Sequence, residues 1–130
     1  MKDFEVLMVE GTNPSGVAMT RDILAAATLF AARQGEAVPT WGFYSPMGGR
    51  VHLQGGISAE TLRLPGRMKN SKSILLIPGI WVENPRELAE RIKADDCQRA
   101  IRRIANHVAG GGQVAASCSA VFLLQAAGVL

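Results

Sequence analysis

The chain has 130 residues, enough for one domain with a sizeable core, and its 48% hydrophobic and 19% charged residues exclude a disordered chain. The longest apolar runs, such as Ile74 to Ile77, are far too short to span a bilayer, and no apolar signal region precedes the first strand-like segment. We therefore expect a cytoplasmic protein with no membrane partner.

The N-terminal part of the chain predicts two strands joined by a long helix. The apolar run from Phe4 to Val9 is typical of a buried strand. Ala- and Leu-rich helical spacing from Val17 to Arg33 predicts a helix, with Ser15 as its N-cap. The stretch from Val38 to Ser45 is rich in aromatic residues and predicts a second strand.

The middle of the chain is less regular. Turn signals on both sides of Arg50 to Leu53 favour a short extended stretch or a hairpin. The segment from Glu60 to Lys72 is polar, and we expect it to be irregular with at most one helical turn. The continuous apolar run from Ser73 to Ile77 predicts a parallel strand covered on both faces, and Pro78-Gly79 ends it.

Two helices are expected next. Asn84 is a suitable N-cap, Pro85 suits the first helical position, and Glu87 occupies the position of a capping-box acid, so a helix should run to about Lys93. A second helix is predicted from about Cys97 to Val108, capped by the preceding aspartates. Part of the net charge of +3 lies on these helices, on Arg91, Lys93, Arg99, Arg102 and Arg103. We interpret these side chains as a solvated face, and since no aromatic residues interleave with them we expect no direct DNA binding by this segment.

The last elements are a short strand from Gln113 to Ser117 and a helix from Ser119 to Ala127. Strands that alternate with helices imply right-handed crossovers and a mostly parallel sheet. The predicted fold is therefore α/β, a flavodoxin-like three-layer sandwich. Because the last strand is expected to be central and the chain ends at Leu130 directly after a helix, we expect the domain to be C-terminally incomplete.

The most informative point of the sequence is Cys118, which lies between a small-residue strand and a helix. This is the pattern of a nucleophile elbow, although the usual flanking glycines are Ala116 and Ala120 here. The start of the following helix would favour a thiolate, and the Pro78-Gly79 loop could point backbone N–H groups at an anion nearby. The alternative is a buried structural cysteine.

The remaining candidates for metal chemistry are dispersed. Cys97 and Cys118 lie in unlike contexts, and neither has metal-ligand spacing. His52 and His107 are far apart along the chain. We predict no metal site, no disulfide and no cofactor.

The stretch from Val114 to Leu130, with Ser117-Cys118-Ser119-Ala120-Val121-Phe122 at its centre, resembles the elbow of the ThiJ/PfpI superfamily of glutamine amidotransferase-like proteins. More narrowly, it resembles the amidase-like N-terminal domain of AraC-type transcriptional regulators. Leu76-Ile77-Pro78-Gly79 is similar to that family's strand and oxyanion loop. The resemblance covers nearly the whole chain, so residues 1–130 would be one truncated domain of this type.

The resemblance also implies a site and partners. Cys118 would be a nucleophile or the vestige of one, and the ligand-binding residues would be Gly79, Ile80, Ser119, Gly16 and Glu10. A homodimer, a small-molecule effector and a C-terminal helix-turn-helix module outside this chain are implied as well.

One departure from the family pattern bears on mechanism. Enzymes of the superfamily usually carry a carboxylate near the cysteine, after the first strand, and that position is Gly16 here; Glu10 and Asp22 are not well placed by this alignment. The leading hypothesis is therefore a ligand-sensing, dimerising regulatory domain without catalytic turnover. The alternative is a cysteine-dependent hydratase, amidase or glyoxalase-like enzyme, and oxidation sensing by Cys118 is compatible with both.

Overall fold

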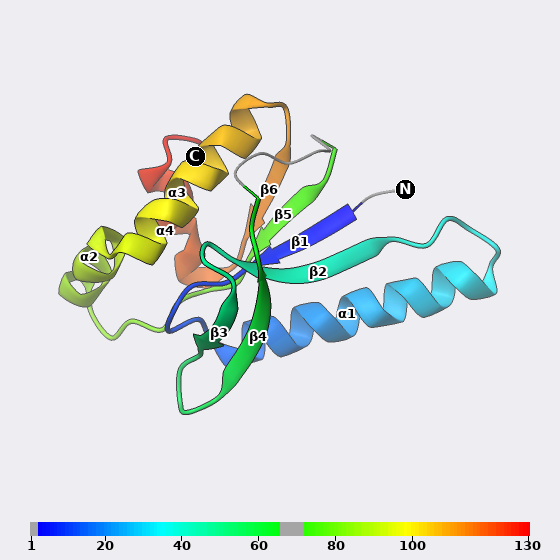
Figure 1. Ribbon diagram of the computed structural model, residues 1–130, viewed down its shortest axis with the longest axis horizontal. Coiled ribbons are helices and arrows are strands. Elements are labelled where there is room, and N and C mark those ends of the chain that lie inside the picture. The colour runs from blue at the N-terminus through cyan, green and yellow to red at the C-terminus, as the bar shows by residue number, and fades with distance from the viewer. Residues whose placement is uncertain (1–2, 66–71) are drawn as a thin grey trace.

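A computed structural model describes residues 3–65 and 72–130 of the chain, which form an α/β domain (Figure 1). Its strands are β1 (Asp3–Leu7), β2 (Thr40–Ser45), β3 (Gly49–His52), β4 (Ser58–Arg63), β5 (Ile74–Ile77) and β6 (Gln113–Ala116). Its helices are α1 (Pro14–Arg33), α2 (Pro85–Lys93), α3 (Asp95–Ala109) and α4 (Val121–Ala126), with a short 3₁₀ turn, η1 (Cys118–Ala120), before α4.

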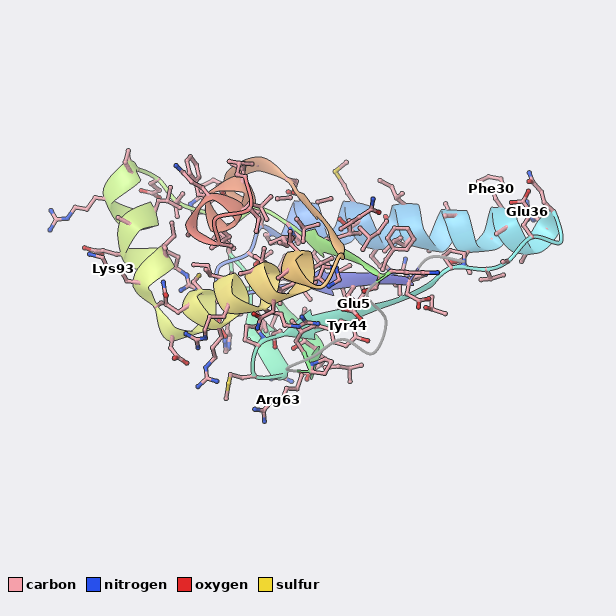
Figure 2. The ribbon with its side chains drawn as sticks, turned by 90° about the horizontal axis from the view of Figure 1, so that it is seen from above. Glu5, Phe30, Glu36, Tyr44, Arg63 and Lys93 are labelled. Atoms are coloured by element: carbon pink, nitrogen blue, oxygen red, sulfur yellow. The ribbon has the colours of Figure 1, made fainter. Side chains whose placement is uncertain are left out.

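The strands form a six-stranded sheet in the order β3-β4-β2-β1-β5-β6, parallel except for the antiparallel β3–β4 pair. Helix α1 lies on one face of the sheet, and α3 and α4 lie on the other (Figure 2). This is the mostly parallel, three-layer α/β sandwich that the alternation of elements predicts.

The core has two parts, one on each face. The larger part joins the sheet to α3 and α4 through buried side chains such as Leu7, Leu75, Ile104 and Leu123. A smaller cluster of Met8, Val51 and Leu53 lies on the α1 side. Strand β5 is parallel, as its unalternating sequence predicts, but only its α3-facing side chains are fully buried; Ile74 and Leu76 are half-buried.

The prediction that the strand before Cys118 is central is wrong for the described chain. Strand β6 pairs with β5 alone among the described residues, so it lies at the edge of the sheet. Gln113 and Ala115 are exposed, and among the described residues no segment pairs with the outer side of the strand.

The hairpin alternative for the middle segment is confirmed. Strands β3 and β4 pair with Gly49 opposite Thr61. The expectation of irregular structure from Glu60 is wrong as far as Arg63, because Thr61 is buried: its hydroxyl lies 2.6 Å from that of Ser45 and donates to the Gly49 carbonyl at 2.7 Å. Residues 66–71, which make up most of the rest of that predicted stretch, lie outside the described residues.

The three longer helices begin at a proline or an aspartate. Asn84 caps α2 as predicted, since its Oδ1 accepts from the Glu87 N–H at 2.9 Å. Ser15 is not the N-cap of α1: the helix begins at Pro14, whose fixed φ suits the first position. Helix α3 begins at Asp95, because the aspartates form its first turn rather than precede it. None of the helices described is long and apolar enough to cross a membrane.

The interpretation of the basic side chains on α2 and α3 as a solvated face is wrong for two of them. Arg103 is only 7% exposed, because it lies on the side of α3 that faces the sheet. Arg91 turns inward to Asp96. Lys93, Arg99 and Arg102 are exposed as expected.

Candidate functional site

The chain makes a strained turn at Cys118, directly after the carboxyl end of β6. Its φ is 52°, and it is the one non-glycine residue with positive φ in the described ranges 3–65 and 72–130. This left-handed conformation costs an L-residue roughly 1–2 kcal/mol. The turn is fixed on both sides, since Ser117 N–H donates to the Ile77 carbonyl at 3.0 Å and Ala120 N–H to the Ser117 carbonyl at 3.1 Å. The Cys118 side chain is exposed.

The next residue, Ser119, holds the turn against the loop after β5. Its hydroxyl accepts from the Ile80 N–H at 2.9 Å and donates to the Ile80 carbonyl at 2.6 Å. A single side chain therefore satisfies both backbone groups of a buried residue. The structure thus brings together Ser119 and Ile80, both predicted as site residues.

Gly79 lies so close to Cys118 that no side chain fits between them. A Cβ on Gly79 would be 3.0 Å from the Cys118 Cβ and 3.3 Å from the Ser117 carbonyl oxygen. Such contacts are shorter than the ordinary 3.4–4 Å, so a side chain at this position would force its neighbours to shift. The glycine is needed here for close approach, and it places the Pro78-Gly79 backbone beside the cysteine, as the sequence predicts.

The loop between β1 and α1 completes this arrangement. Asn13 N–H donates to the Gly79 carbonyl at 2.8 Å, and Trp81 N–H donates to the Gly11 carbonyl at 2.9 Å. Gly16 is also in contact, because a Cβ there would lie 3.2 Å from that of Pro78. The loops after β1, β5 and β6 therefore meet at the edge formed by the carboxyl ends of parallel strands.

Asn13 is a residue of this site that the sequence analysis did not identify. Its amide nitrogen would be 3.3 Å from a Cβ on Gly79, and its Oδ1 is buried without a hydrogen-bond partner in the described part of the chain. Its position immediately before the helix-starting Pro14 is typical of a capping residue. It makes no side-chain cap, and the amide is instead directed at the site loops.

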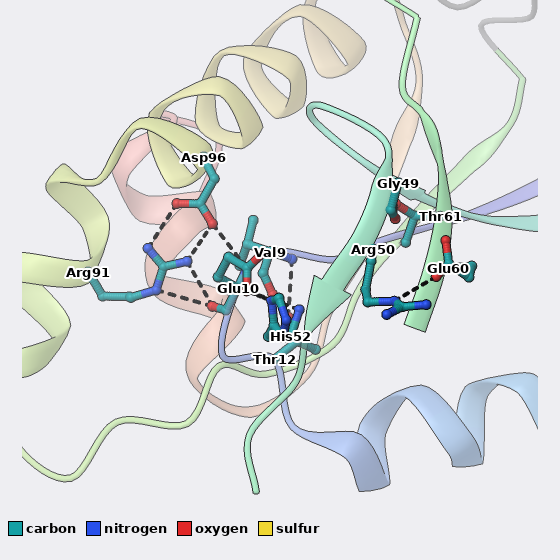
Figure 3. Close-up of polar contacts among 10 residues, drawn as sticks. All are labelled: Val9, Glu10, Thr12, Gly49, Arg50, His52, Glu60, Thr61, Arg91 and Asp96. Atoms are coloured by element: carbon teal, nitrogen blue, oxygen red, sulfur yellow. Dashed lines mark hydrogen bonds and ion pairs between the residues drawn. The ribbon is translucent and has the colours of Figure 1, made fainter. Parts of the chain in front are cut away.

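Glu10 is engaged in contacts with His52, Arg91 and Asp96 (Figure 3). Its Oε2 accepts from the His52 N–H at 3.0 Å and lies 3.5 Å from the His52 Nδ1. Its backbone carbonyl accepts from Arg91, and its N–H donates to the Asp96 Oδ2 at 3.0 Å. The Glu10 carboxylate thus links the loop after β1 to the end of β3.

The Arg91–Asp96 pair fixes this loop to the α2–α3 junction. Both side chains are about one fifth exposed, and Arg91 Nη1 donates to Asp96 Oδ1 at 2.9 Å. Burial of the Asp96 carboxyl opposes its ionisation, but the hydrogen bond from Arg91 and those from the Glu10 and Cys97 N–H groups outweigh burial and lower its pKa below the ordinary 3.8. Arg91 also donates to the Glu10 carbonyl, and the sequence gives no signal for that contact, because the two residues are 81 positions apart.

The two cysteines are chemically different. Cys97 is fully buried in the core, and burial raises the pKa of its thiol to about 11. Cys118 is exposed, and its Cβ lies beside Gly79. None of the hydrogen bonds among the described residues reaches the Cys118 thiol, so the arrangement offers a nucleophile without an attached acid or base. Across residues 3–65 and 72–130, no group of His, Cys, Asp or Glu side chains is arranged to hold a metal ion.

The chain is similar in structure to solved proteins of two kinds. One is an AraC family transcriptional regulator from Pseudomonas putida, with a TM-score of 0.74 and 18% identity over 100% of this chain and 63% of that one. A second is a proposed transcriptional regulator from Vibrio parahaemolyticus, with a TM-score of 0.71 and 22% identity over 99% of this chain and 62% of that one. The other kind is represented by Drosophila melanogaster DJ-1beta, with a TM-score of 0.61 and 16% identity over 98% of this chain and 61% of that one.

These likenesses establish the fold, and the chain spans about three fifths of the length of each of these structures. No family model and no curated protein sequence matches the chain. The fold expected from the ThiJ/PfpI resemblance is confirmed, and it is the fold shared by an AraC family regulator and by DJ-1 proteins.

Proposed function

We propose that this domain is the ligand-sensing, dimerising part of a cytoplasmic AraC-family transcriptional regulator, and that it binds a small-molecule effector at the Cys118 turn without turning it over. Two of the similar solved structures, with TM-scores of 0.74 and 0.71, are described as transcriptional regulators, which supports the choice. Cys118, Gly79, Ile80, Ser119 and Gly16 would contact the effector, and Asn13 would join them.

The observation that carries this proposal is the position of Gly16. It contacts Pro78, beside the loop that Cys118 faces, and has no side chain to give or take a proton. Glu10, one of the two acids equally near to Gly16 along the chain, is engaged with His52. A positioned acid or base contributes roughly a hundred- to ten-thousand-fold to such reactions, so a thiol alone would catalyse them poorly.

The test is an assay of the intact protein against amides, isocyanides and 2-oxoaldehydes, with Cys118→Ser as the control. We expect no turnover that depends on Cys118, while the substitution changes effector binding. A robust rate that disappears in Cys118→Ser would overturn the sensor proposal.

The same result would support the second candidate, a cysteine-dependent enzyme. The observation in its favour is the strained Cys118 backbone beside Gly79, which leaves the cysteine exposed at the end of β6. In that case Glu10, Asp22 or a residue outside the described part of the chain would have to transfer the proton, and Asn13 would only hydrogen-bond to the reacting groups. Asn13→Ala would then abolish or reduce the rate, whereas a sensor would lose affinity only.

Dimerisation is proposed through α1. Its outer face exposes apolar side chains over much of its length: Met19, Ile23, Leu29 and Phe30 are each about half exposed or more. Light scattering of the intact protein should give a dimer, and Ile23→Glu should shift it toward monomer. Arg21→Glu, which introduces a glutamate at an exposed position on another side of the same helix without removing apolar surface, is the matched control.

DNA binding is proposed to belong to a helix-turn-helix module outside residues 1–130. The intact protein should bind operator DNA in a gel-shift assay, and the 130-residue chain alone should not. Tight, sequence-dependent binding by the 130-residue chain would contradict this assignment.

A further inference from the structure

A second pocket lies on the α3 side of the sheet, between α3 and the end of β4. It is a cavity of about 250 Å³ whose lining includes Arg63, Arg99, Arg102, Arg103 and Asn106. The rest of its described wall is apolar, and none of the described lining residues carries a carboxylate. We call this the arginine pocket.

Arg103 is the unusual member of the pocket. Its side chain comes from the buried face of α3, and the residue is 7% exposed. Its Nε and Nη2 are buried and have no hydrogen-bond partner among residues 3–65 and 72–130. A guanidinium presents five donors in a rigid fork, and leaving buried donors unpaired is costly. Burial also lowers the pKa of Arg103, so the folded protein disfavours this charge unless something else compensates it.

The nearby acid Glu5 compensates the Arg103 charge only in part, because its charge raises the pKa of Arg103 by less than burial lowers it. Glu5 lies on β1 beside Tyr44 and α3 (Figure 2), yet its Oε2 is also buried without a described partner, and no ion pair joins it to Arg103. Burial raises the pKa of Glu5, and the charge of Arg103 only partly offsets that rise. The Glu5 carboxyl is therefore a weak counter-ion.

The other arginines of the pocket leave it positive. Arg99 binds Asp95 at 2.7 Å, but both side chains are exposed and such pairs are weak. Arg63 and Arg102 form no ion pair with any described residue. The field in the pocket therefore favours a negatively charged occupant with several oxygen acceptors.

We propose that the arginine pocket binds a small anion with two or more charged oxygens, either a phosphate monoester or a polycarboxylate. Guanidinium forks match both groups, because two parallel N–H donors meet two oxygens. The cavity is below the range of about 300–1,000 Å³ usual for drug-sized ligands, so the anion would be small. Arg103 would bind from the floor of the pocket, and Arg63 and Arg102 from its rim.

This site is separate from the Cys118 turn, since the two share no residue. The inference therefore does not rest on the proposed regulatory function, and either can fail without the other.

The experiment is calorimetric titration of the protein with inorganic phosphate, glycerol phosphate and citrate at constant ionic strength. We expect saturable binding of at least one probe, weakened roughly tenfold or more in Arg103→Met, which removes the charged fork but keeps the volume. Arg86→Met, which removes an equally positive but 91% exposed side chain on α2, is the matched control and should bind like wild type. Tighter binding of glycerol phosphate would identify a phosphate monoester, and tighter binding of citrate a polycarboxylate.

A second variant covers the case in which Arg103→Met fails to fold. Arg102→Gln changes an exposed rim residue and should weaken binding several-fold without affecting the fold. The proposal is overturned if the wild-type protein shows no saturable binding of any probe, or if Arg86→Met weakens binding as much as the pocket variants do, because the effect would then be one of net charge.

Discussion

Gly112 lies directly against the imidazole ring of His107, so that a Cβ on Gly112 would be 2.3 Å from the ring Nε2. The ring cannot move away easily. It is 4% exposed, and its Nε2 lies 3.0 Å from the Ser73 carbonyl oxygen and 3.1 Å from that of Gln113. The end of α3 is thereby joined to the starts of β5 and β6, the strands that lead to the site loops.

Gly112→Ala should therefore destabilise the protein by about 2–3 kcal/mol, because the methyl group must displace a buried, hydrogen-bonded ring. Urea unfolding at neutral pH measures the loss. Gly110→Ala is the control, since a Cβ there meets nothing closer than 3.4 Å and its cost should be below about 1 kcal/mol. Equal losses in the two variants would show that the contact with His107 is unimportant.

A methyl group at Gly79 should act on the site itself. Gly79→Ala would press on the Cys118 Cβ and the Ser117 carbonyl, and we expect a stability loss of about 1–3 kcal/mol together with a changed rate of Cys118 alkylation. Labelling kinetics under native conditions provide the second readout. An unchanged labelling rate in a folded Gly79→Ala protein would mean that the thiol position does not depend on this loop.

Local features of the sequence were enough to predict some elements. The capped start of α2 depends on Asn84, Pro85 and Glu87, which act within one turn, and β5 is an apolar run that few other structures could bury. The part of β4 from Glu60 to Arg63 is not predicted, because Thr61 is polar and its burial depends on Ser45, a partner from another strand. Sequence patterns report on near neighbours, and β4 is stabilised by distant ones.

In the candidate site, too, the features that depend on neighbouring residues could be predicted and those that depend on distant contacts could not. The turn at Cys118 and the loop at Gly79 follow from small residues at the end of a strand. The contact of Glu10 with His52 and the burial of Arg91 and Arg103 could not be predicted. A charged side chain is expected to be exposed to solvent, and these three are placed by contacts that only the folded chain brings together.

The Arg91–Asp96 pair should make stability depend on pH. The pKa of Asp96 is lower in the folded state than its ordinary 3.8. The stability contributed by the ionised carboxylate is therefore fully present above pH 3.8 and is lost as the pH falls through the folded pKa. Asp96→Asn should cost about 1–3 kcal/mol near neutral pH, and the difference from wild type should shrink at acid pH.

The matched control is the neighbouring aspartate. Asp95→Asn removes an exposed partner of Arg99 in the same helical turn, and it should cost less than about 1 kcal/mol. Denaturant unfolding of both variants between about pH 7 and pH 3 separates the two cases. A difference between Asp96→Asn and wild type that stays constant down to low pH would contradict the assignment.

The cysteines should react at very different rates. At about pH 8 a thiol with a pKa of about 11 is roughly one part in a thousand ionised, and Cys97 is also inaccessible. Iodoacetamide should therefore label Cys118 in the native protein and Cys97 only after unfolding, as peptide mass spectrometry would show. Rapid native labelling of Cys97 in Cys118→Ser would mean that α3 opens readily.

The positive φ of Cys118 sets stability against chemistry at one position. A glycine would adopt this backbone without strain, whereas the cysteine gives up roughly 1 kcal/mol to do so. Selection for heat resistance alone would therefore favour Cys118→Gly, and the most stable variant of this turn would be one that has lost its thiol. Engineering that improves the domain by thermal criteria would erase the side chain on which its function is proposed to depend, unless binding is screened together with melting temperature.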